Sequence, residues 1–301
     1  MLFEQIRLNR RRTVWLVAVF ILLLAAVGWA VGELVRADGR SGLIVALILS
    51  AVYVPFVFLT ANRQILAMSG AREVTEGEYP ELVHIVEALS MAARIPMPKV
   101  YVIDDPSPNA FATGLTPRRS AVAFTTGLLE RLNRAELEGV AAHEISHIRN
   151  YDIRLMTVAI ALVGVIAVLA DFGTRLLYWG GIAGGGRARR RNDRNQGLFL
   201  LIALVLVILA PIAAQFVRFA VSRNREFLAD ASAVDLTRNP RGLIEALRKI
   251  GEDPHDVRRA NDATASLYFA PPKAAFRRLD ASRWFATHPP IRERIRRLEM
   301  M

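Results

Sequence analysis

The sequence predicts a multi-pass α-helical membrane protein with a small α+β domain that is split by a membrane hairpin. Two observations carry this fold class. The 301 residues are 53% hydrophobic, which exceeds the share in an ordinary soluble domain. Much of this apolar content lies in four long runs, whereas residues 61–154 and 218–301 have the mixed polarity of soluble elements.

The first two apolar runs, residues 13–31 and 43–60, contain no charged side chain. Each approaches the roughly 20 residues that a helix needs to cross the hydrocarbon layer. Arginines at 10–12 precede the first run, as they would in a signal peptide, but the run is longer than the roughly 7–15 apolar residues of such a peptide. We therefore expect residues 1–60 to form an uncleaved anchor of two transmembrane helices.

Two further apolar runs, residues 155–170 and 198–217, predict a third and a fourth transmembrane helix within the segment 155–217. A pair of buried core helices is the alternative, because the third run is short. A Gly/Arg-rich loop joins the two runs and would lie outside the cell if both cross, contrary to the preference of arginine for the cytoplasmic side. Either the rule is violated locally or this hairpin does not fully cross.

The soluble segment 61–154 reads as a small α+β unit. Its periodicity predicts a helix near residues 80–94, strands at Lys99–Asp104 and Asn109–Gly114, and an extended segment at Ala121–Thr125. The segment 218–301 reads as mostly helical. Apolar residues recur there at helical spacing: Leu243, Ile244, Leu247 and Ile250, then Ile291, Ile295 and Leu298.

The most informative motif is the H-E-x-x-H run formed by His143, Glu144 and His147. A helix places both imidazoles on one face, four residues apart, where they can hold one zinc ion. Asn133 and Glu136 have the spacing of a capping box, so a helix is expected to begin there. Apolar residues continue it at helical spacing: Leu137, Val140, Ala141, Ile145 and Ile148. The alternative is a surface helix with two solvated histidines.

A catalytic zinc typically has three protein ligands, so a third must come from elsewhere. The chain contains no cysteine, which leaves histidines and carboxylates. The other histidines are His84, His255 and His288. Glu226 is a better candidate, because Asp230 lies one helical turn beyond it and could hold a ligand histidine. On spacing alone, both carboxylates suit a solvated acidic face beside Arg223 and Arg225 equally well.

Three stretches resemble the HtpX family of membrane zinc metalloproteases, which are relatives of the CAAX prenyl proteases. They are residues 95–152, which include the H-E-x-x-H motif, residues 225–230 (Arg-Glu-Phe-Leu-Ala-Asp) and residues 287–295 (Thr-His-Pro-Pro-Ile-Arg-Glu-Arg-Ile). The resemblance covers nearly the whole chain, including the order of the apolar runs. It implies a zincin-like α+β metalloprotease domain whose small sheet has a substrate-pairing edge strand.

The same resemblance implies specific roles for residues of this chain. His143, His147 and Glu226 would bind one zinc ion per chain, and Glu144 would act as the catalytic base. His288 would donate to the oxyanion, with Arg294 as a second candidate, although a histidine before two prolines is also typical of a turn. The substrate-pairing residues would be Asn109, Ala110, Phe111 and Ala112, a stretch that also reads as an ordinary half-buried strand.

The expected function is therefore a membrane-bound zinc endopeptidase that hydrolyses polypeptides, in particular misfolded or damaged membrane proteins. The arginines near the N-terminus indicate a cytoplasmic N-terminus, and two spans return the catalytic domain to the cytoplasmic face of a bacterial-type inner membrane. The net charge of +11 is expected to face lipid phosphate, because no nucleic-acid-binding module is present. Two alternatives remain: a prenyl-protein processing protease, and a non-enzymatic membrane protein with a structural metal site.

Overall fold

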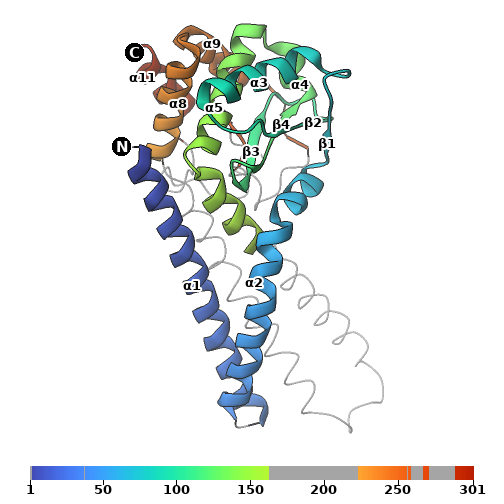
Figure 1. Ribbon diagram of the computed structural model, residues 1–301, viewed down its shortest axis with the longest axis vertical. Coiled ribbons are helices and arrows are strands. Elements are labelled where there is room, and N and C mark those ends of the chain that lie inside the picture. The colour runs from blue at the N-terminus through green and yellow to red at the C-terminus, as the bar shows by residue number, and fades with distance from the viewer. Residues whose placement is uncertain (1, 37, 163–222, 256, 259–266, 271–288) are drawn as a thin grey trace.

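The computed structural model describes residues 2–36, 38–162, 223–255, 257–258, 267–270 and 289–301. In this part of the chain, two long helices extend away from a domain in which further helices cover a four-stranded sheet (Figure 1). The expected third and fourth spans lie outside the described residues, except that residues 152–162 are helical.

The two long helices are α1 (Leu2–Arg36) and α2 (Gly39–Ser69), which lie side by side as a hairpin (Figure 1). Small residues allow a close approach between them. A Cβ atom added at Gly42 would lie 2.0 Å from the carbonyl oxygen of Gly28, so any larger side chain there would push the helices apart. Such contacts between small residues are a common way for membrane helices to pack.

Both helices are long and apolar enough to cross a membrane, over Ile6–Glu33 and Gly39–Ser69. They contain the runs 13–31 and 43–60 expected from the sequence. Only 11% and 17% of their most apolar windows is buried, whereas the core helix of a soluble protein would be mostly buried. Large apolar side chains such as Trp15 and Leu59 are exposed, which favours lipid over water around this hairpin.

The second helix continues past the expected boundary at residue 60. Its last turns bury Ile65 and Leu66 in the same cluster as Ile103 and Phe111 of the sheet. The helix ends at Gly70, whose φ of 67° is the left-handed conformation typical of a C-terminal cap. The polar end of α2 therefore belongs to the domain rather than to the membrane anchor.

The sheet has the order β1-β2-β4-β3, with β2 and β4 parallel and the other pairs antiparallel. Its strands are β1 (Ala71–Glu73), β2 (Lys99–Ile103), β3 (Ala110–Thr116) and β4 (Arg119–Thr125). The three longer strands confirm the sequence prediction. Strand β1 was not predicted, because three residues are too few to show an alternating pattern. Strand β3 lies at an edge of the sheet.

Alternate residues of the strands enter two different hydrophobic clusters. Ala112 and Val122 pack with the helices α3 (Pro80–Ala93) and α5 (Arg134–Arg149), whereas Phe111 and Ala123 pack with α2 and with residues 152–162. This alternation follows from the two-residue period of a strand. The sheet therefore has α3 and α5 on one face and the end of α2 on the other.

The remaining helices are α3 (Pro80–Ala93), α4 (Thr126–Arg131), α5 (Arg134–Arg149), α8 (Arg223–Thr237), α9 (Pro240–Glu252) and α11 (Ile291–Leu298). The predicted helix at 80–94 is confirmed, and the described part of 218–301 is mostly helical, as expected. Leu243, Ile244, Leu247 and Ile250 of α9 are buried in the core, which confirms the predicted stripe. Of the second stripe, Leu298 is buried, and Ile291 and Ile295 pack against the same cluster.

Candidate metal centre

The helix α5 carries the H-E-x-x-H motif and begins where the sequence predicts. The Asn133 side chain accepts from the Glu136 N–H at 3.0 Å, and the Glu136 carboxylate accepts from the Asn133 N–H at 2.8 Å. This reciprocal capping box satisfies two helix-end donors. The predicted apolar residues of α5 are buried: Leu137, Val140, Ala141, Ile145 and Ile148. The motif is therefore held on a helix anchored in the core.

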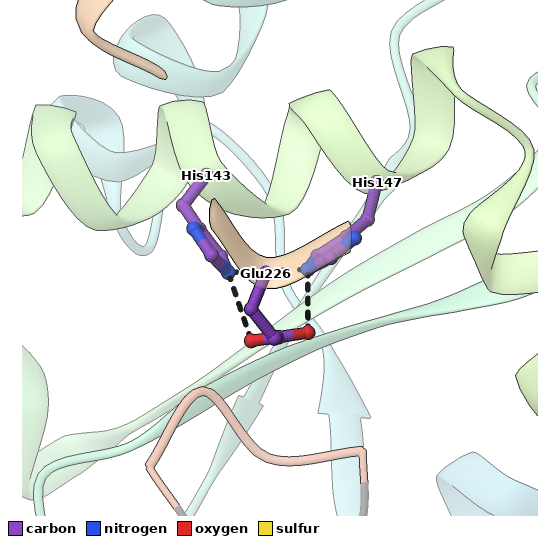
Figure 2. A group of neighbouring side chains, drawn as sticks. All are labelled: His143, His147 and Glu226. Atoms are coloured by element: carbon purple, nitrogen blue, oxygen red, sulfur yellow. Dashed lines mark hydrogen bonds and ion pairs between the residues drawn. The ribbon is translucent and has the colours of Figure 1, made fainter. Parts of the chain in front are cut away.

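Three side chains from two helices converge beside the sheet (Figure 2). His143 and His147 project from the same face of α5, with their Nε2 atoms 3.1 Å apart. Glu226 of α8 reaches both rings: its Oε2 lies 3.8 Å from Nε2 of His143, and its Oε1 lies 3.5 Å from Nε2 of His147. These residues form a group that could hold a metal ion, with all ligand atoms within 4.8 Å of one another.

The donor set fits a tetrahedral zinc ion. Ligands about 2.0–2.1 Å from such an ion lie about 3.3–3.4 Å from one another, close to the separations of these nitrogen and oxygen atoms. Two imidazole nitrogens at 3.1 Å repel through their lone pairs unless a proton or a cation lies between them. The arrangement is thus one that a cation stabilises.

A carboxylate faces the other ring nitrogen of each histidine. Asp230 Oδ1 lies 2.9 Å from Nδ1 of His143, and Asp152 Oδ2 lies 3.2 Å from Nδ1 of His147. Such partners set the tautomer, so that Nδ1 carries the hydrogen and Nε2 is left to bind a metal. Asp230 was expected from the sequence to meet a ligand histidine, and the structure brings the two together.

Asp152 is a residue that the sequence interpretation missed. It follows α5 after Tyr151, whose φ of 60° turns the chain through the left-handed region. That turn brings Asp152 back toward His147, five positions earlier. A non-glycine residue with positive φ is uncommon, and the sequence around Tyr151 gives no signal from which this turn could be predicted.

The surroundings move the pKa values of the two histidines in opposite directions. Burial, helped by the charge of Arg294, lowers the pKa of His143 to about 4. Burial also acts to lower the pKa of His147, but the hydrogen bond that its ring donates to Asp152 and the charges of Glu226, Asp152 and Glu144 outweigh it and raise that pKa to about 9. His143 is therefore neutral near pH 7, and metal binding must displace a proton from His147.

Arg294 of α11 lies behind this site and is 1% exposed. Its Nε donates to Asp230 Oδ2 at 2.9 Å and its Nη2 to Oδ1 at 2.6 Å, while Nη1 donates to the Phe269 carbonyl at 3.0 Å. Burial acts to raise the pKa of Asp230, but the charge of Arg294 and the hydrogen bond with His143 hold it below its usual value. Arg294 thus holds the Asp230 carboxylate on two sides, and its role as a second oxyanion donor, which the resemblance implies, stays a prediction.

Two other residues, Glu144 and His288, were expected to take part in catalysis. Glu144 lies in α5 between the two histidines and is 2% exposed. It therefore lies within the buried region that contains the metal-binding group. His288 lies outside the described residues.

The edge strand β3 runs past the site and is partly covered by the segment 267–270. The Asn109 side chain donates to the Ala270 carbonyl at 2.7 Å and accepts from the Ala270 N–H at 3.1 Å, while the Ala110 carbonyl accepts from the Phe269 N–H at 2.8 Å. The Thr125 N–H donates to the Asn109 carbonyl. Because backbone groups alternate in direction along an antiparallel pair, the N–H and C=O of Phe111 face β4, and those of Ala110 and Ala112 face away from it.

This fold and site define a metalloprotease: an H-E-x-x-H helix beside an edge strand, with a carboxylate that reaches both histidines from a second helix. A profile of Peptidase family M48 matches residues 76–301. The chain belongs to this family, and it is a membrane metalloprotease that acts on polypeptides.

Two relatives of similar length carry a more specific name. A Protease HtpX homolog of Listeria monocytogenes is 50% identical over 306 residues, and one of Ligilactobacillus salivarius is 48% identical over 303 residues. Each comparison covers 100% of both chains. The resemblance to HtpX proteins is thereby confirmed. Among solved structures, the crystal structure of S. mikatae Ste24p has a TM-score of 0.48 and 18% identity, covering 99% of this chain and 66% of that one.

Proposed function

We propose that this metalloprotease is a zinc endopeptidase in which His143, His147 and Glu226 hold one zinc ion and Glu144 is the catalytic base. The observation that carries the proposal is the convergence of two Nε2 atoms and a carboxylate within 4.8 Å, with a further carboxylate facing each Nδ1 atom. Two imidazoles and a carboxylate, with no thiolate, form a ligand set that suits catalytic zinc.

The reaction follows from the positions of these groups. When bound, zinc supplies water activation at neutral pH and polarisation of the scissile carbonyl. Glu144 takes the proton of the attacking water and returns it to the leaving amine. Asp230 and Asp152 keep both imidazoles in the ligating tautomer throughout. His288 is the proposed donor to the oxyanion, on the basis of its place in the Thr-His-Pro-Pro stretch.

The substrate is proposed to pair as an extended strand with the edge of β3, over Asn109, Ala110, Phe111 and Ala112. Asn109 and Ala110 bond residues 269–270, and the Gly114 N–H bonds Thr157 Oγ1 at 3.0 Å. Between these contacts, the backbone N–H and C=O of Ala112 face away from β4. Ala112 is therefore proposed as the centre of the pairing site. Main-chain pairing demands little of the substrate sequence, which suits a protease for misfolded proteins.

The substrates are proposed to be membrane proteins, and the site to face the cytoplasm at a bacterial-type inner membrane. Two observations support a site close to the lipid. α1 leads away from the domain (Figure 1), and near its start Asn9 bonds Asp152, which faces His147. The helical residues 152–162 leave the site in the same direction and meet α2, where Tyr53 donates to the Ala161 carbonyl at 3.2 Å. Arginines at the start of α1 support the cytoplasmic side.

The proposed division of the chain is the one expected from the sequence. It comprises the anchor 1–60, a first catalytic part 61–154, a membrane hairpin 155–217 and a second catalytic part 218–301. The end of α2 packs on the sheet, so the first catalytic part includes the last turns of that helix, residues 61–69.

Hydrolysis of an unfolded protein by the detergent-purified chain tests this function. Glu144→Gln, compared at equal metal content, is expected to lose cleavage. Glu138→Gln is the matched control, since Glu138 lies on the same helix and makes a surface pair with Arg134. Equal cleavage by the Glu144 variant would refute the role of the base. Turnover of a prenylated peptide but not of the unfolded protein would favour prenyl-protein processing instead.

A further inference from the structure

The first membrane helix reaches into the support of the metal site. Asn9 of α1 is 1% exposed. Its Nδ2 donates to Asp152 Oδ1 at 2.7 Å and to the Asn150 carbonyl at 3.1 Å. The other oxygen of the same carboxylate, Oδ2, faces Nδ1 of His147 at 3.2 Å. A continuous path of contacts therefore connects α1 to a histidine of the metal-binding group.

The geometry divides the Asp152 carboxylate between two partners. Asn9 engages one oxygen and His147 the other, so the amide sets the rotation of the carboxylate that orients the imidazole. The Asp152 side chain is 5% exposed, and a buried carboxylate depends strongly on donors for its orientation. Arg225 lies farther away, with its Nη1 3.8 Å from Oδ1. The Asn9 contact is therefore the closest to that oxygen in the described part of the chain.

A purely structural role does not account well for an asparagine here. The Oδ1 atom of Asn9 is buried with no hydrogen-bond partner among the described residues, and such an atom costs stability relative to an apolar side chain. An apolar residue of similar volume would remove that penalty. The asparagine thus lowers the stability of the fold and in return places an N–H donor against Asp152.

Neighbouring contacts hold this part of α1 in place. The Arg10 guanidinium lies over the Tyr151 ring, 5.1 Å from its centroid, next to the bonds of Asn9 with Asn150 and Asp152. The start of α1 therefore contacts the whole turn at residues 150–152.

We propose that Asn9 is a positioning residue for the metal site, acting through Asp152 on His147, so that α1 supports the catalytic centre as well as anchoring the chain. The inference rests on the proposed zinc site. Removing a partner in the outer shell of a metal site typically weakens metal binding by about 10–100-fold. Asn9 acts one contact further out, so we expect Asn9→Leu to weaken zinc binding by about tenfold, at the lower end of that range.

The experiment measures zinc affinity of the full chain in detergent by competition with a chromophoric chelator, together with thermal unfolding. Asn9→Leu is expected to lower the affinity with little change in unfolding temperature. Asn9→Ala, whose side chain is smaller than asparagine, should lower the affinity as well, which shows that the effect does not come from a poor fit of leucine. Thr13→Val is the matched control, because it removes a buried polar group of α1 that does not touch Asp152. It should leave the affinity unchanged.

A double-mutant cycle separates positioning from general destabilisation. In an Asp152→Ala background, Asn9→Leu should weaken zinc binding no further, since its effect passes through Asp152. Wild-type affinity in both Asn9 variants, or an equal loss with and without Asp152, would overturn the inference. His147→Ala distinguishes an error about Asn9 from an error about the zinc site. If this variant binds zinc as the unchanged chain does, the zinc site itself is misassigned.

Discussion

Replacement of Arg294 by methionine tests the arrangement behind the metal centre. The change removes the two hydrogen bonds to Asp230, the one to the Phe269 carbonyl and the 3.3 Å contact of Nη2 with Nδ1 of His143, while an unbranched side chain fills most of the space. Asp230 is buried with a side-chain exposure of 3%. Leaving one member of a buried ion pair uncompensated costs about 3–5 kcal/mol. With roughly 2–4 °C lost per kcal/mol in a chain of this size, the unfolding temperature should fall by about 6–20 °C.

Thermal unfolding in detergent measures this loss, with Arg296→Met as the control. Arg296 lies on the same helix and is exposed, so its removal should change stability by less than about 0.5 kcal/mol. The double variant Asp230→Leu with Arg294→Met should be more stable than Arg294→Met alone, because no buried charge is then unpaired. If Arg294→Met unfolds within a degree of Arg296→Met, the reasoning about this buried pair is wrong.

Three further changes follow from the site and the hairpin. Zinc affinity should fall about tenfold per pH unit below pH 9, because the pKa of His147 is raised to about 9 and zinc must displace the proton of that ring. Chelator competition at pH 6.5 and 7.5 measures this dependence, and equal affinities at the two pH values would contradict it. Asp152→Ala should weaken zinc binding by about 10–100-fold, measured in the same assay, where wild-type affinity would show that His147 needs no partner. Gly42→Leu should lower the unfolding temperature, because its Cβ would meet the Gly28 carbonyl oxygen at 2.0 Å, whereas Ala51→Leu on the exposed side of α2 should not.

The parts of the fold that the sequence predicts depend on short-range interactions. The start of α5 follows from a capping pair three residues apart, and the face that carries His143 and His147 follows from a spacing of four. The long apolar helices follow from composition, because a helix is the structure that satisfies its own backbone hydrogen bonds in lipid. The strands β2, β3 and β4 follow from runs long enough to display their pattern.

The site could be predicted only in part. Glu226 and Asp230 have helical spacing, but that spacing suits a solvated acidic face as well as a metal site. The packing of α8 against α5 decides between the two, because it buries both carboxylates beside the histidines. Helical spacing puts Arg294 on the side of α11 that carries Ile291 and Leu298, but only the packing of α11 brings it to Asp230.

The sequence by itself determined that two histidines share a helix face on which they can hold a metal, and that two helices can span a membrane. Only the tertiary structure decided which groups support that metal site. Asp152 meets His147 through a left-handed turn at Tyr151, and Asn9 meets Asp152 across 143 positions of sequence. The physical reason is range: helix periodicity and capping act between residues three or four apart, whereas a buried hydrogen bond between distant residues exists only once the packing of whole helices has brought donor and acceptor together.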